Sequence, residues 1–255
     1  MSKNRLELFR KKRLTEISKR KGRPVQPSTV NRDVSNLRAM LNKALEHAKI
    51  EINPIGRIKL LEENNVRERV LSQDEFESLY LHCPPSLKGI VLIGFYLPMR
   101  QAEILNLTWK EIDLKMGFIR LGGERTKNKI GRNIPLHPRI IKFLRTCPRP
   151  IDGGYVFGNS RRFNRKAYNK AVESAGIADF NFHDLRHCAI NNMRLAGNDH
   201  FVIKQASGAK TDSAFQRYNL VTEQEMKSIK WLDEKSGKSG TMDTYMDTST
   251  KTKIV

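Results

Sequence analysis

Apolar residues recur at helical spacing along most of this chain, whereas sequence typical of β-strands is confined to residues 117–136. In that stretch FIRL, a glycine pair, the basic loop ERTKNKIGR and the short apolar NIPL predict a small antiparallel sheet. A small sheet beside many helices is an α+β fold that is mainly α. Helices are predicted over residues 27–49, 73–82, 86–97, 101–107, 138–146, 161–175, 184–196, 199–207 and 211–218.

The polar segment EENNVRERV, residues 62–70, separates two parts of the chain. It has no apolar periodicity, and Ser72 and Glu75 then form a capping-box pattern that begins a new helix. We therefore expect a domain boundary there, with one domain over 1–66 and a second over 67–232. Residues 233–255 are rich in Ser, Thr, Gly, Lys and Asp, which predicts a flexible C-terminal tail or a segment that becomes ordered only on a partner.

The charge is strongly positive, with 47 Lys and Arg against 27 Asp and Glu and a formal net charge of +20. Such a surface attracts polyanions, above all nucleic acid, although ribosomal and membrane-surface proteins share this property. On the 27–49 helix Arg32, Asn36, Arg38 and Lys43 lie off the apolar stripe, where they could contact a DNA backbone. A solvated charged face would give the same pattern.

Cysteine spacing favours a protein of the reducing cell interior, and hydropathy favours one that is neither secreted nor inserted in a membrane. Cys83, Cys147 and Cys188 are too widely spaced for a disulfide framework or a cysteine-rich zinc site. The N-terminal residues lack the apolar core of a signal peptide, and the apolar run at 90–97 is too short to span a bilayer. We expect a cytoplasmic protein without a membrane partner.

Two short motifs carry the residues best suited to phosphate chemistry. In PMRQAEIL, Arg100 stands at the start of an amphipathic helix with Glu103 one turn later. In HDLRH, His183, Arg186 and His187 occupy neighbouring positions of one helical face. A phosphate group could meet guanidinium and imidazole groups there.

The order of these motifs resembles the active-site signature of the tyrosine recombinase, or phage integrase, family. Arg100 is followed by the basic hairpin, by HDLRH and, about thirty residues later, by Tyr218 in AFQRYN. The boxes PMRQAEILNLTW, TKN with RNIPL, FHDLRH and SGAKTDSAFQRYN extend the resemblance over residues 28–232. It implies a short, SAM-like helical core-binding domain over 1–66 and a mostly helical catalytic domain over 67–232, which close around duplex DNA.

The resemblance also implies the chemistry, which is DNA strand breakage and rejoining through a 3′-phosphotyrosine intermediate without metal or other cofactor. Tyr218 would be the nucleophile, and Arg100 and Arg186 would hold the non-bridging phosphate oxygens. His183 would accept the tyrosine proton or position its acceptor.

Position in the family makes Lys127 the general acid for the departing 5′-oxygen, with Lys129 as the nearby alternative. Taken alone, a lysine on a basic hairpin is better explained as a phosphate contact, and its position in the family reverses that preference. Glu103 and His187 would support the site rather than act on DNA, and no acidic partner completes a zinc motif around the histidines.

The chain departs from the family pattern at Ala209, because a His or Trp that donates a hydrogen bond usually follows the glycine of this box. Loss of one such donor predicts slower cleavage or religation. An introduced substitution, a decaying mobile-element enzyme and a lineage that uses another donor such as Lys210 all remain open.

Three functions are compatible with these residues. The first is an active site-specific recombinase or integrase, encoded by a bacterium or phage, that works on DNA as a homo-oligomer with four protomers in the synaptic complex. The second is a catalytically weakened DNA-binding remnant of a mobile-element integrase. The third is a monomeric enzyme resembling type IB topoisomerases. Exchange of the C-terminal segment, residues 221–232 or 253–255, between protomers is a further expectation from the resemblance.

Overall fold

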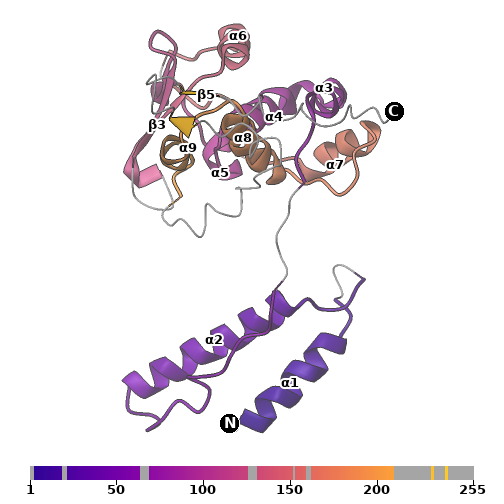
Figure 1. The fold of residues 1–255 in the computed structure, drawn as a ribbon, viewed down its shortest axis with the longest axis vertical. Helices are drawn as coiled ribbons and strands as arrows, with labels where there is room; N and C mark the ends of the chain where they lie inside the picture. The colour runs from indigo at the N-terminus through magenta and orange to yellow at the C-terminus, as the bar shows by residue number, and fades with distance from the viewer. Residues whose placement is uncertain are drawn as a thin grey trace, which may run out of the picture. The chain divides into compact units, whose positions relative to one another are not determined.

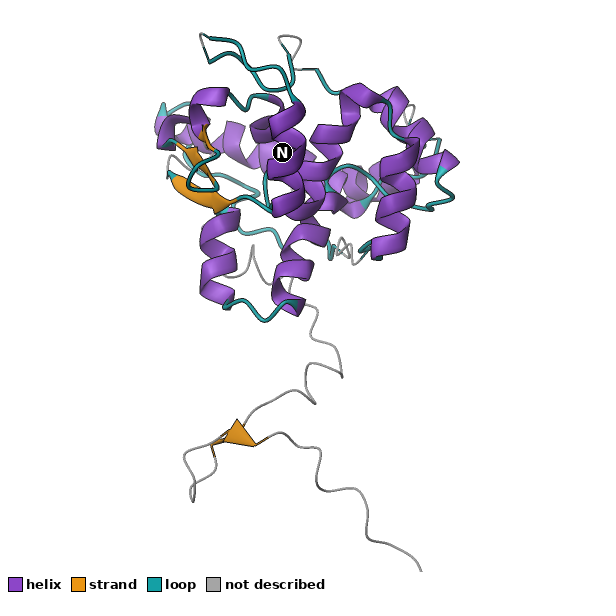
Figure 2. Cartoon of the chain, turned by 90° about the horizontal axis from the view of Figure 1, so that it is seen from above, coloured by secondary structure: helices purple, strands orange, loops and turns teal. Residues whose placement is uncertain are grey.

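The computed structural model describes residues 3–18, 22–63, 69–125, 131–151, 153–158, 162–209, 231–232 and 239–240. The chain divides into two compact units, Met1–Val66 and Arg67–Val255 (Figure 1). Helices make up most of the described residues and strands a small part (Figure 2). The mainly α, α+β fold class predicted from the sequence is therefore confirmed.

The described residues of the first unit form two packed helices, α1 (Lys3–Thr15) and α2 (Pro27–Glu46). Proline at the first position of α2 favours its start, since the missing N–H has no helical acceptor there. The helix ends three residues earlier than predicted, and Ala48 takes a left-handed φ of 51°. Leu6 of α1, Val34 of α2 and Ile55 form the buried centre of this small core.

The second unit carries the remaining described elements. They are α3 (Gln73–His82), α4 (Pro85–Tyr96), α5 (Gln101–Leu105), β1 (Ile112–Asp113), β2 (Phe118–Leu121), β3 (Arg132–Pro135), α6 (Pro138–Thr146), α7 (Arg165–Ser174), α8 (Asp184–Leu195), α9 (His200–Ser207), β4 (Trp231–Leu232) and β5 (Ser239–Gly240), with 3₁₀ turns at Trp109–Glu111 and Gly123–Arg125.

Helix α4 is the centre of the second unit and is apolar almost all round, with eight buried residues. It packs against α3, α5, α6 and α8, and Figure 1 shows α8 beside it. Gly89 is needed at the contact with α6, because a Cβ there would lie 2.4 Å from Cε1 of Phe143. This packing fixes the end of α4, from which the chain runs directly to Arg100.

The sheet is antiparallel in the order β1–β2–β3. FIRL and the RNIP part of the predicted hairpin pair in register, with Ile119 opposite Ile134 and Leu121 opposite Arg132. Ile119 and Ile134 are fully buried, so the sheet covers one face of the core. The short strand β1, which the sequence did not predict, pairs with the first half of β2.

Several predicted boundaries shift for local reasons. Helix α5 ends at Leu105 rather than residue 107, with Asn106 as its C-cap, and a 3₁₀ turn follows. Helix α7 begins at Arg165 rather than residue 161, because the side chain of Asn164 accepts the backbone N–H of Ala167 and caps it. The predicted 211–218 helix lies outside the described residues.

Near the C-terminus, Trp231 pairs with Gly240 and Leu232 with Ser239 to form the two-stranded β4–β5 ladder. The other residues of the predicted flexible tail, 233–238 and 241–255, lie outside the described residues. Within the parts of the chain that the structure describes, no helix has both the length and the apolar character that crossing a membrane requires.

Candidate functional site

Arg100 occupies the junction between α4 and α5 and is the N-cap residue of α5. Leu97 and Met99 just before it are buried, so the backbone that carries Arg100 is anchored in the core. Its side chain is 28% exposed, enough to reach a bound ligand. The Arg100 guanidinium donates from Nη1 to Oε1 of Glu103 at 3.0 Å, and its backbone N–H donates to Oε2 at 2.7 Å.

Glu103 is buried and accepts hydrogen bonds from two arginines. Burial by itself raises the pKa of Glu103, but hydrogen bonds and charge from Arg132, together with those from Arg100, outweigh it and leave the pKa below its ordinary value. The carboxylate is therefore charged at neutral pH, and it holds Arg100 on the protein surface by a charge-assisted contact.

Arg132 is the site residue that sequence reasoning missed. It stands on β3 with its side chain only 5% exposed, and Nη2 lies 2.7 Å from Oε2 of Glu103. Its Nη1 lies 3.3 Å from Oε1, and its Nε donates to the backbone oxygen of Ala206 at 2.9 Å. The burial pattern of β3 alternates, with Arg132 and Ile134 inward. Arg132 ends the predicted basic loop ERTKNKIGR, but β3 begins with it, one residue before the predicted NIPL strand. An arginine two residues before Ile134, on the same face of an extended segment, was the signal that could have identified it.

Arg186 projects from the first turn of α8 and is 4% exposed. It donates from Nη1 to the backbone oxygen of Pro98 and from Nη2 to the backbone oxygen of Ser207 at 2.9 Å. The first contact lies two residues before Arg100, and the second lies at the last residue of α9. Arg186 thus connects the two segments that carry the rest of the site.

The C-terminal end of α9 is where the arginines meet. The backbone oxygens of three consecutive residues, Ala206, Ser207 and Gly208, accept from Arg132, Arg186 and Arg100 respectively, the last at 3.4 Å. The last carbonyls of a helix lack helical partners and carry partial negative charge, so they attract cations. This row of carbonyls gathers three guanidinium groups from β3, α8 and the start of α5.

His183 is the N-cap of α8 and lies at the protein surface. Desolvation lowers the pKa of the His183 imidazole, and the positive charges of Arg186 and Arg100 lower it further, against the opposing charge of Asp184. The neutral ring is thereby favoured. His187, one turn later and half-buried, has its ring 5.7 Å from that of His183 in an edge-to-face arrangement.

Ala209 follows the left-handed C-cap of α9, Gly208, whose φ is 68°. The backbone N–H of Ala209 donates to Oγ of Ser207 at 3.2 Å, and its methyl group packs on the cluster of Ile190 and Ile203. A side-chain donor at this position would start next to the carbonyl that Arg100 contacts.

The structure brings together part of the predicted site. Arg100, Glu103, Arg186 and the Gly208-Ala209 turn are connected by hydrogen bonds, and His183 is close enough to be influenced by both arginines. The other predicted participants lie outside the described residues. These are Lys127, Lys129, Lys210 and Tyr218.

The four predicted DNA contacts on α2 differ in their surroundings. Arg32, Asn36 and Lys43 are exposed. Arg38 is half-buried and donates from Nη2 to the backbone oxygen of Ile58 at 2.7 Å, so it ties α2 to the following loop. The same unit carries Asn31, buried on α2, which pairs with both the N–H and the carbonyl of Leu61.

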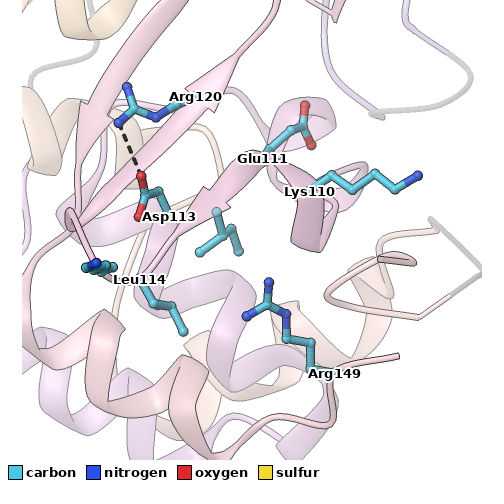
Figure 3. A pocket seen from close by; sticks show the side chains of 8 residues that line it. Lys110, Glu111, Asp113, Leu114, Arg120 and Arg149 are labelled. Atoms are coloured by element: carbon cyan, nitrogen blue, oxygen red, sulfur yellow. Dashed lines mark hydrogen bonds and ion pairs between the residues drawn. The ribbon is translucent and has the colours of Figure 1, made fainter. Parts of the chain in front are cut away.

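An open pocket of the second unit lies beside the 3₁₀ turn and β1 (Figure 3). Arg120 and Asp113 form an ion pair at its edge, and the Arg149 guanidinium lies over the Trp109 ring. Its lining residues within the described chain include none of the arginines gathered at α9. They are Lys110, Glu111, Ile112, Asp113, Leu114, Lys115, Arg120 and Arg149.

Comparison with known proteins identifies the family of this chain. The model of the Phage integrase family matches residues 69–225, which include Arg100, Arg186 and Tyr218. This chain belongs to the phage integrase family, the tyrosine recombinases. The resemblance found in the sequence motifs is thereby confirmed.

Among its curated relatives, this integrase-family chain is 31% identical to the shufflon-specific DNA recombinase of Escherichia coli over 215 residues, or 82% of the chain. It is 26% identical over 216 residues, or 78% of the chain, to the integrase of Salmonella phage P22. The chain covers 55% of the length of each of these two relatives.

Solved structures share the fold of this family member. A dimer of λ integrase bound to a COC′ core site matches with a TM-score of 0.67 at 16% identity, covering 86% of this chain and 79% of that one. The Tn1549 transposon integrase in complex with transposon right end DNA matches with a TM-score of 0.66 at 16% identity, covering 89% and 83%.

Proposed function

We propose that this protein is a site-specific DNA recombinase, or integrase, which cuts and rejoins DNA through a 3′-phosphotyrosine intermediate at Tyr218. The observation that carries the proposal is the meeting of Arg100 and Arg186, from separate helices, at the end of α9. Two guanidinium groups held in one place offer the paired donors that a phosphodiester in a transfer reaction requires. Membership of the phage integrase family supports the same function.

In this mechanism Arg100 and Arg186 bind the non-bridging oxygens of the scissile phosphate and stabilise the negative charge that develops there. Both are preorganised, since Glu103 holds the first and two backbone carbonyls hold the second. Tyr218 attacks phosphorus, the bond to the 5′-oxygen breaks, and the DNA 3′-phosphate becomes joined to the phenol oxygen. Attack by a 5′-hydroxyl reverses the step and rejoins a strand.

Two proton transfers accompany this exchange. The phenol has an ordinary pKa near 10 and must lose a proton, and neutral His183, favoured by its lowered pKa, accepts it or positions the acceptor. The departing 5′-oxygen gains a proton from Lys127, with Lys129 as the alternative. Glu103 and His187 support these groups and do not touch DNA.

The partner in this proposal is duplex DNA at a recombination site. The λ and Tn1549 integrases were solved bound to DNA, and the net charge of +20 suits a polyanion. We propose that residues 1–66 form the core-binding domain and residues 67–232 the catalytic domain. The exposed side chains of Arg32, Asn36 and Lys43 then contact the DNA backbone. Four protomers assemble in the synaptic complex, and the reaction takes place in the cytoplasm.

Covalent capture on a mixture of many DNA sequences tests the activity. The full chain is incubated with a random-sequence duplex library carrying single nicks, adducts that survive SDS are isolated, and their DNA is sequenced. The expected result is an enriched sequence joined to protein, with the join mapped to Tyr218 by mass spectrometry. Tyr218→Phe is the control and should give no adduct. An adduct of equal yield with Tyr218→Phe would overturn the proposal.

The role of Lys127 is tested with the enriched sequence. A 5′-bridging sulfur replaces the departing oxygen, and because a thiol has an ordinary pKa near 8.5 it leaves without protonation. Lys127→Ala should be slow on the oxygen substrate and close to wild type on the sulfur substrate. Equal defects on both substrates would instead make Lys127 a phosphate contact, and the same pair of substrates examines Lys129.

Ala209 favours one alternative function, a DNA-binding remnant whose transfer chemistry is weakened. This alternative predicts DNA binding with a much lower yield of adduct from the unmodified chain than from Ala209→His. Equal adduct yields from the two proteins would exclude it.

A further inference from the structure

Among the residues that the structure describes, the charged groups that act most strongly on Glu103 are Arg132, from β3, and Arg100, at the start of α5. Arg132 makes the closer contact and does so where both partners are almost fully buried, with side-chain exposures of 5% and 6%. A buried ion pair of this kind is destabilised by loss of either partner, because the other charge is then left without compensation. The position of the Glu103 carboxylate therefore depends on Arg132.

Arg132 is not placed to bind DNA itself. All three of its side-chain nitrogens contact protein oxygens, two on Glu103 and one on Ala206. The backbone of Gly208 covers it, since a Cβ built there would lie 3.0 Å from Nη1 and 3.2 Å from Cζ of Arg132. A guanidinium enclosed in this way can act on a phosphate only through the residues that it holds.

The residues that Arg132 holds are those that carry the proposed phosphate donors. Glu103 binds the Arg100 guanidinium, and Ala206 lies next to Ser207, whose carbonyl binds Arg186. We propose that Arg132 is a positioning residue for DNA strand transfer, which fixes Glu103 and the end of α9 so that Arg100 and Arg186 keep one geometry. This inference rests on the proposed function.

The test compares single-turnover rates of covalent adduct formation on the enriched nicked duplex at saturating protein, with DNA affinity measured separately. Arg132→Met should lower the rate roughly 10- to 100-fold, because small displacements of reacting groups carry penalties of this order. DNA affinity should change much less. Arg139→Met is the matched control, since it removes a more exposed ion pair with Glu77 between α6 and α3, and its rate should equal that of wild type.

A double-mutant cycle separates positioning from general stability. If Arg132 acts through Glu103, Arg132→Met should have little further effect on the rate in a Glu103→Gln background. In the Arg132→Met variant Glu103 stays buried while its main opposing cation is lost, so the pKa of Glu103 rises. The rate of Arg132→Met should then fall more steeply than that of wild type as the pH is lowered, and Glu103→Gln should remove this extra dependence.

Arg132→Lys and a chemical probe keep the test decisive if the methionine variant folds poorly. Lysine retains the charge beside Glu103 but not the bond to Ala206, so a rate between those of wild type and Arg132→Met is expected. Phenylglyoxal modification of Arg100, followed by mass spectrometry on the free protein, should be faster in Arg132→Lys than in Arg139→Met.

The inference is overturned if wild type forms the adduct and both Arg132 variants match its rate, or if Arg100 reactivity is unchanged. Absence of an adduct in wild type would instead count against the proposed function. In that case the phenylglyoxal comparison still decides whether Arg132 holds Arg100.

Discussion

Substitution of Gly208 by alanine tests how closely the end of α9 packs against Arg132. Two effects are expected to lower the free energy of unfolding of this variant. A left-handed φ of 68° costs an alanine about 1–2 kcal/mol, and the added Cβ would meet the Arg132 guanidinium at 3.0 Å. Displacing that buried group resembles overpacking of a core and costs about 1–3 kcal/mol more. We expect Gly208→Ala to lower the free energy of unfolding by about 2–5 kcal/mol.

Gly176 provides the matched control, because it follows the C-cap of α7, Ala175, with a φ of 71° and a Cβ there would have nothing within 4 Å. Gly176→Ala should therefore cost only the backbone penalty of about 1–2 kcal/mol. Urea unfolding of the full chain measures both variants, and thermal scans should show a shift of about 2–4 °C for each kcal/mol. Equal losses for the two alanine variants would refute the close contact between Gly208 and Arg132.

Three further outcomes follow from the site. Ala209→His should raise the rate of adduct formation, by up to about 10²- to 10³-fold if it restores a missing donor, and an unchanged rate in single-turnover assays would show that the donor is not needed. The His183 imidazole should titrate below its ordinary pKa of 6.5, so that the ring becomes charged only at lower pH. An NMR titration midpoint at or above 6.5 would contradict the effect of burial and of the two neighbouring arginines. Deletion of residues 241–255 should weaken assembly of protomers on DNA, judged by native gel electrophoresis, and should leave unfolding of the free chain unchanged because both strands of the β4–β5 ladder stay. Normal assembly would remove the idea of exchange through residues 253–255.

Sequence periodicity predicted the fold class because helix and strand spacing reflect local backbone geometry. The capping box at Ser72 and Glu75 located the start of α3 to the residue, since cap chemistry depends only on neighbours in the chain. The end of α5 and the strand at 112–113 were not predicted. The strand at 112–113 forms by pairing with β2, and the spacing of apolar residues around 112–113 does not encode that pairing.

The candidate site was predicted only in part for the same reason. Motif order pointed to Arg100 and Arg186, but their acceptors are mostly backbone oxygens, and the identities of Pro98 and Ser207 give no sign of that role. Arg132 carried a readable signal, since it stands two residues before Ile134 and shares its inward face in an extended strand. A buried charge there needs a buried partner of opposite charge, which Glu103 provides. The basic composition of the hairpin obscured it.

The row of carbonyls at the end of α9 also affects how this family member can change over generations. An acceptor made of main chain is present whatever side chain stands at residues 206 and 207, so drift at those positions does not delete it. The vulnerable points are the arginines themselves and Gly208, whose replacement would strain the turn. A lineage can therefore exchange a residue beside this row, such as the one at position 209, and still retain the backbone acceptors that gather the three arginines.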